Sequence, residues 1–131
     1  MFIHGDEMKK KGFTVIELIL VIVVVSILAA IAIPNYMNTK EGAINKEAKA
    51  NLKLIIAANK IYKMENSSYY ASSSITDINN NLKLALPSST SRNWNYTTTG
   101  TSASCAQATR YGGSTTWHIR NTEDDVTSGG C

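Results

Sequence analysis

The longest apolar run in the chain, Phe13 to Ile33, constrains the fold more than any other feature. It holds 21 residues, and its polar members are Thr14, Glu17 and Ser26. As an α-helix the run is about 32 Å long, which matches the ~30 Å hydrocarbon core of a bilayer. The run is therefore a membrane-spanning segment or an export signal. The other residues of this 131-residue chain have to build their own core.

Charges beside the apolar run indicate its orientation. Three lysines, Lys9 to Lys11, precede the run. Because lysines in short loops hold a segment end in the cytoplasm, we expect 13–34 to span the membrane and 35–131 to lie outside it. Met1 and Met8 are alternative start residues. The formal net charge of +3 is too small to indicate nucleic-acid binding by itself.

The residues after the run keep helical character as far as Glu65. Pro34 and Gly42 are expected kinks, because proline removes a backbone donor and clashes with the preceding turn. We therefore predict one long, bent helix over about 13–65. Apolar residues at three- and four-residue spacing form a stripe along its second half: Ile44, Ala48, Leu52, Ile55, Ile56 and Tyr62.

The rest of the chain predicts an α+β fold. Residues 66–91 are rich in serine and asparagine and predict a loop with weak local order. Five apolar residues are expected to pack this loop onto the helix: Ile75, Ile78, Leu82, Leu84 and Leu86. Alternating apolar and polar residues in 92–131 predict antiparallel strands near 93–99, 104–111 and 114–121. The resulting three- or four-stranded sheet would pack on the C-terminal half of the helix and bury Trp94, Trp117 and the tyrosines.

The two cysteines, Cys105 and Cys131, both lie in the polar half. Outside the cytoplasm they are free to form a disulfide, which would close a 27-residue span and contribute about 3 kcal/mol in the loop-entropy description. The alternative, a metal site or a redox pair, needs closer spacing or further ligands. We expect the disulfide.

The segment with the most specific pattern joins the lysines to the apolar run. It reads KKKGFTVIEL over 9–18, and AAIAIPNY follows over 29–36. A carboxylate such as that of Glu17 is costly in hydrocarbon and needs a partner. Cleavage after Gly12 would give Phe13 a new amino group close to Glu17 in sequence. The segment resembles the class III signal of type IV pilins and pseudopilins, closely over about 30 residues and more loosely, in architecture, to the end.

The resemblance implies a role for each matching residue. Gly12 would precede the cut made by a prepilin peptidase, which removes the leader 1–12. Phe13 would become the mature N-terminus and be N-methylated by the same enzyme. Glu17 would pair with the Phe13 amine of a neighbouring subunit during assembly. Pro34 matches the proline at the membrane-distal end of the apolar segment.

The resemblance also implies the partners. Copies of the chain and related minor pilins would bury their apolar helices in a filament, because burial of apolar surface in water contributes roughly 25 cal/mol per Å². The work of extraction from the inner membrane would come from a cytoplasmic ATPase acting through an assembly platform, since the sequence holds no GxxxxGK[ST] motif. A pilus subunit for adhesion, twitching motility or DNA uptake is favoured. A type II secretion pseudopilin is the alternative, and an adhesin or DNA-binding tip module is a third possibility.

Simpler interpretations account for less of the sequence. A Sec signal fits the A-x-A pattern at 30–32, and a plain single-span anchor fits the length, but neither explains Glu17.

The acidic residues 123–125 lack the ligand spacing of a calcium loop, and Asn66 and Asn95 begin glycosylation sequons that often arise by chance. No catalytic motif is evident, so we predict no enzyme activity, cofactor or metal.

Overall fold

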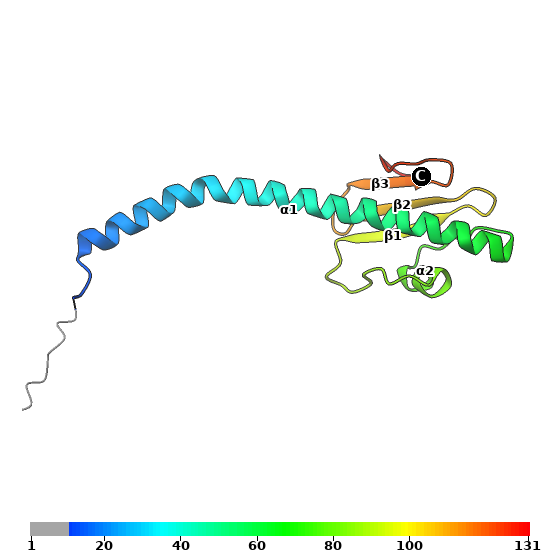
Figure 1. Ribbon diagram of the computed structural model, residues 1–131, viewed down its shortest axis with the longest axis horizontal. Helices are drawn as coiled ribbons and strands as arrows, with labels where there is room; N and C mark the ends of the chain where they lie inside the picture. Colours follow the sequence, from blue (N-terminus) through cyan, green and yellow to red (C-terminus); the bar gives the residue numbers. More distant parts are fainter. Residues whose placement is uncertain (1–10) are drawn as a thin grey trace, which may run out of the picture. The chain divides into compact units, whose positions relative to one another are not determined.

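The computed structural model describes residues 11–131, so the choice between Met1 and Met8 and most of the predicted leader lie outside the described residues. The chain divides into two units, 1–40 and 41–131, and each is described by itself. The element order is α1 (Val15–Asn66), α2 (Ile75–Leu82), β1 (Trp94–Thr99), β2 (Cys105–Arg110), β3 (Thr116–Arg120) and β4 (Thr127–Ser128) (Figure 1).

The first unit contains the apolar part of α1. Within residues 11–131, α1 is the one helix long and apolar enough to cross a membrane. It starts at Val15 and continues through Pro34, which confirms the predicted long helix. The kinks predicted at Pro34 and Gly42 remain predictions.

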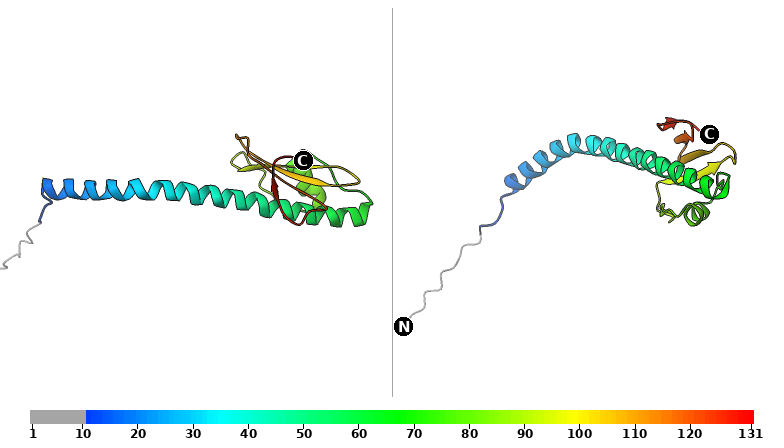
Figure 2. Two further views of the ribbon diagram at one scale, coloured as in Figure 1. Left: turned by 90° about the horizontal axis from the view of Figure 1, so that it is seen from above. Right: turned by 45° about the vertical axis from the view of Figure 1, so that its right-hand side comes forward.

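The second unit, 41–131, contains a four-stranded antiparallel sheet. The sheet packs on the second half of α1 (Figures 1 and 2). The strand order is β1-β2-β3-β4, and successive strands are neighbours throughout. The predicted α+β architecture is therefore confirmed, with β4 as an additional short strand. Gly112, at φ +74°, lies in the turn between β2 and β3, where the sequence indicates a tight turn.

The core of this unit lies between α1, α2 and one face of the sheet. Helix α1 buries the predicted stripe, and the sheet contributes Trp94, Tyr96 and Ile119. Trp94 also donates from Nε1 to the Ile44 carbonyl at 2.9 Å. Trp117 is only partly buried against the core, and Tyr111 is 48% exposed. The expected burial of every tyrosine is therefore wrong, because Tyr111 lies just after β2, in the turn that leads to β3.

One buried position in the stripe of α1 is polar. Asn59 is fully buried; its Nδ2 donates to the Tyr70 carbonyl and to Ser104 Oγ, and its Oδ1 accepts from the Tyr70 N–H. These hydrogen bonds satisfy a side chain that would otherwise be costly to bury. They fasten the segment after α1, and the residue preceding β2, to the helix.

Residues 66–91 contain more structure than the predicted loop. Ser74 caps the N-terminus of α2 by accepting from the Asp77 N–H at 3.4 Å, and Lys83 ends the helix in a left-handed conformation. The predicted docking is confirmed, because Ile75, Ile78, Leu82 and Leu86 are buried in the core and Leu84 packs against it. The prediction of weak order was wrong at α2, where burial of one face outweighs the low helix propensity of its asparagines.

Candidate functional site

The site expected from the sequence is the start of α1, where Thr14 and Glu17 interact. Thr14 Oγ1 accepts from the Glu17 N–H at 3.3 Å, and Glu17 Oε2 accepts from the Thr14 N–H at 3.4 Å. This reciprocal pair is a capping box, which satisfies two backbone donors that have no partner inside the helix. The negative charge of Glu17 in the first turn is also favourable beside the helix dipole.

The residues around the expected cleavage point lie beside Glu17. A shallow surface depression of about 240 Å³ is lined by Lys11, Gly12, Phe13 and Glu17. A Cβ atom added at Gly12 would meet no atom within 4 Å. Nothing in the described surroundings of Gly12 therefore requires glycine at this position.

The apolar residues that follow have no partner within the described residues. Every large apolar side chain from Phe13 to Ile33 is at least 47% exposed, and Phe13 reaches 86%. A helix that is apolar on all sides is stable only in lipid or inside an assembly. The arrangement combines three properties: an unobstructed glycine before the helix, a carboxylate in the first turn and an apolar surface that needs a partner.

The cysteines form the expected disulfide. Cys105 Sγ and Cys131 Sγ are 2.05 Å apart, and the bond links the first residue of β2 to the last residue of the chain. Gln107 Oε1 also accepts from the Cys131 N–H at 2.9 Å. The bond therefore holds the C-terminal segment against the sheet.

Two of the acidic residues in 123–125, Glu123 and Asp125, are engaged with cations and with the backbone. Glu123 accepts from the Arg120 N–H and from the Arg120 guanidinium, both at 2.9 Å, and these bonds lower the pKa of Glu123. Asp125 accepts from the Val126 N–H and pairs with Lys53 at 3.2 Å, and the pKa of Asp125 is likewise lowered. Both carboxylates are therefore charged at neutral pH and tie the loop after β3 to its surroundings.

Two further polar residues, His118 and Asn66, have structural contacts. His118 contacts the Gly129 carbonyl through Nδ1 and Thr127 Oγ1 through Nε2, so it holds β4 and the chain end on β3. Asn66, at the end of α1, donates to the Tyr62 carbonyl at 3.0 Å. Within residues 11–131, no group of three metal-ligating side chains is close enough to hold an ion.

Comparison with known proteins identifies the N-terminal segment. Residues 8–33 match the family described as the prokaryotic N-terminal methylation motif. The type IV major pilin protein PilA of Myxococcus xanthus is 43% identical over 61 residues, which are 47% of this chain and 28% of the relative. These matches support the type IV pilin and pseudopilin family for the N-terminal segment.

Matches to pseudopilins cover a similar share of this chain. The type II secretion system core protein G of Dickeya chrysanthemi is 35% identical over 63 residues, covering 48% of this chain and 41% of the relative. The corresponding protein of Pseudomonas aeruginosa is 39% identical over 61 residues, covering 47% and 43%. The chain thus spans less than half the length of these relatives. They support the family and membrane anchoring through the apolar helix, and leave the choice between pilus and pseudopilus open.

Sequence reasoning missed one residue of this site. Thr14 was noted only as a polar member of the apolar run, although it caps α1. The signal was present in the sequence, because threonine followed three residues later by glutamate is a capping-box pattern.

Proposed function

We propose that this protein is a structural, non-catalytic subunit of a type IV pilus-like filament. The observation that carries the proposal is the first turn of α1, where Glu17 lies beside Gly12 and Phe13 at the head of an exposed apolar helix. The subunit is made as a precursor in the inner membrane, with its N-terminus in the cytoplasm and residues 35–131 outside. A prepilin peptidase cuts between Gly12 and Phe13 and methylates the new amine.

Assembly exchanges the lipid around the apolar helix for other copies of that helix. Extraction exposes apolar surface, and its burial against neighbouring subunits stabilises the filament by roughly 25 cal/mol per Å². Glu17 then pairs with the Phe13 amine of a neighbour, so neither charge remains alone in an apolar interior. A platform protein with a cytoplasmic ATPase supplies the work. Related minor pilins are further partners.

Residues 35–131, the head of the proposed subunit, favour a pilus over a pseudopilus. The Cys105–Cys131 disulfide closes a C-terminal loop that resembles the disulfide-bonded loop of pilins. The carboxylates of Glu123 and Asp125 are held by Arg120 and Lys53, whereas calcium binding by some secretion pseudopilins requires free oxygen ligands. The roles that follow are adhesion, twitching motility or DNA uptake.

A pseudopilin of a type II secretion system is the second candidate, because several relatives are core protein G of that system. Deletion of the gene separates the two. Loss of surface filaments with normal export supports the pilus, and periplasmic accumulation of secreted proteins supports the pseudopilus.

Mass spectrometry of sheared surface filaments tests the proposal directly. The expected result is an abundant chain that starts at methylated Phe13. A chain that keeps residues 1–12 in the assembled filament, or one cut after Ala32, would refute the processing and with it the assigned role of Glu17.

A further inference from the structure

A threonine hydroxyl and an imidazole meet on the face of the sheet that is turned away from the core. Trp117 and Ile119 pack against the core, so His118 between them points to the opposite face. Thr127 of β4 is paired with His118 of β3 in the strand register, which places their side chains on the same face. Thr127 Oγ1 and His118 Nε2 are 3.1 Å apart. Thr127 is exposed, whereas His118 is only 7% exposed.

The chain end fixes which nitrogen of this imidazole carries the proton. His118 Nδ1 lies 3.0 Å from the Gly129 carbonyl oxygen, and a carbonyl can only accept a hydrogen bond. Nδ1 is therefore the protonated nitrogen, and in the neutral ring Nε2 is left to accept from the Thr127 hydroxyl. Gly129 holds its carbonyl there with a φ of +108°, a conformation that favours glycine, while its N–H donates to the Thr116 carbonyl at 3.0 Å.

These three groups have the geometry of an activated nucleophile. A hydroxyl becomes reactive when it donates to a base that is itself oriented by a third group. We propose that Thr127 is an acylation site, with His118 as its base and the Gly129 carbonyl as the group that positions the base. This inference goes beyond the proposed filament role and does not depend on it.

The reaction is the transfer of an acyl group from an activated ester. Thr127 Oγ1 attacks the ester carbonyl carbon and forms a new C–O bond, and the bond to the leaving alcohol breaks. His118 Nε2 takes the hydroxyl proton and returns it to the leaving alcohol. The product is a threonine ester that forms once per chain, so the site is one of modification and not of turnover.

The charges around the pair suit this chemistry. Arg120 is the main cause of the lowered pKa of Glu123, and the charge of His118 contributes to it. Glu123 in turn favours the imidazolium that forms during the transfer. Transfer of a phosphoryl group would instead need cations to neutralise the phosphate oxygens. The nearby cations are engaged elsewhere, because Lys53 pairs with Asp125 and Arg120 pairs with Glu123.

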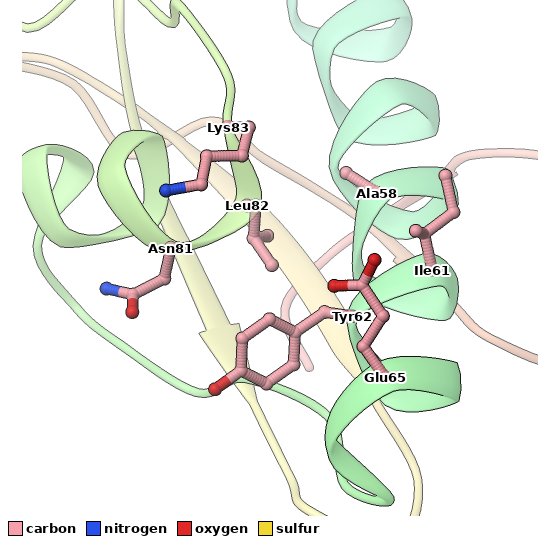
Figure 3. A pocket seen from close by; sticks show the side chains of 7 residues that line it. All are labelled: Ala58, Ile61, Tyr62, Glu65, Asn81, Leu82 and Lys83. Carbon is pink, nitrogen blue, oxygen red and sulfur yellow. The ribbon is translucent and has the colours of Figure 1, made fainter.

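The groove between α1 and α2 offers no comparable arrangement. Its volume is about 210 Å³, and its lining includes Tyr62, Glu65 and Lys83 (Figure 3). Among the hydrogen bonds of residues 11–131, none joins the Tyr62 hydroxyl to Glu65 or to Lys83. Thr127, by contrast, has both a bonded base and open space nearby, since a Cβ atom added at Gly129 would meet no atom within 4 Å.

Acetylation of the full chain in detergent by p-nitrophenyl acetate tests the proposal, at about pH 8, where a histidine side chain is ordinarily neutral. Mass spectrometry of proteolytic peptides follows each threonine. The internal control is Thr99, which is also exposed but whose Oγ1 donates to the Cys105 carbonyl at 3.4 Å, a group that takes up no proton. Thr127 should be acetylated at least about tenfold faster than Thr99, because a general base contributes a factor of about 10² or more.

Two variants separate the base from the structural contact. His118→Asn keeps an N–H that can donate to the Gly129 carbonyl but has no base, and it should lower acetylation of position 127 to the rate of Thr99. Thr127→Ser keeps the hydroxyl and should retain the fast rate. Equal rates for Thr127 and Thr99 in the wild-type chain overturn the proposal without any variant, and so does an unchanged rate in a folded His118→Asn chain.

Discussion

Replacement of Glu17 separates the capping role that this side chain has in the structure from the charge pairing proposed for it in the filament. In the free subunit the carboxylate caps α1, and in the proposed filament its charge neutralises an amine. Glu17→Gln keeps an oxygen that can accept the Thr14 N–H, because glutamine also serves in a capping box. Glu17→Ala removes both functions. The glutamine variant therefore isolates the charge.

Of these two contributions, we expect the cap to be the smaller. Glu17 Oε2 lies 3.4 Å from Thr14 N and 3.5 Å from Thr14 Oγ1, and both contacts are exposed. Hydrogen bonds of this length are weak, and loss of a helix cap costs about 1 kcal/mol. Removal of one member of a buried charge pair costs about 3–5 kcal/mol, because the other charge is left unpaired. The second cost corresponds to at least about a hundredfold in an assembly equilibrium.

The assay is the yield of sheared filaments from cells that express each variant at equal level, with membrane-bound subunit and its N-terminus measured in parallel. We expect both variants to insert in the membrane, and both to lose filaments by at least about a hundredfold. Glu17→Asp, which keeps the charge on a shorter side chain, is the control and should retain part of the yield. Wild-type yield from Glu17→Gln would show that capping, and not charge, is what assembly requires.

Three further predictions concern the head and use unfolding of fragment 35–131, which contains the whole core cluster. Asn59→Ala should destabilise it by about 3 kcal/mol, because Tyr70 and Ser104 lose buried partners; the partly exposed Asn79→Ala should cost less. Cys131→Ser should lower its stability by about 3 kcal/mol, seen as a lower urea midpoint that reductant no longer changes. Burial raises the pKa of Tyr96 to about 12, so the fragment should lose stability as pH rises from about 10 toward 12, where the unfolded chain releases this proton first. Tyr96→Phe should remove that part of the alkaline loss, and an unchanged pH profile would contradict the assignment.

The parts of the fold that the sequence predicts are those with a long or strongly periodic signal. The 21-residue apolar run and the stripe from Ile44 onward locate α1. Alternation around Trp94 and Trp117 locates β1 and β3 to within about two residues, as is usual for element ends. The disulfide was predictable because a chain with two cysteines offers one pairing.

The elements that sequence reasoning missed depend on tertiary contacts. The sequence of α2 is ITDINNNL, whose asparagines are poor helix formers. Its helical state depends on burial of Ile75, Ile78 and Leu82, which requires the sheet and α1 to be in place. Asn59 is hidden for a similar reason, because a polar residue in an apolar stripe becomes stable only through partners 11 and 45 positions away.

Helix α1 shows why an exposed apolar surface is harder to find than a core. In the sequence, Leu54 and Ile61 share the helix with Leu52, Ile55 and Ile56, and helical spacing alone does not say which set faces the sheet. The structure assigns the second set to the core and leaves the first exposed. An apolar helix face becomes evidence of a partner only after the fold has used the other face.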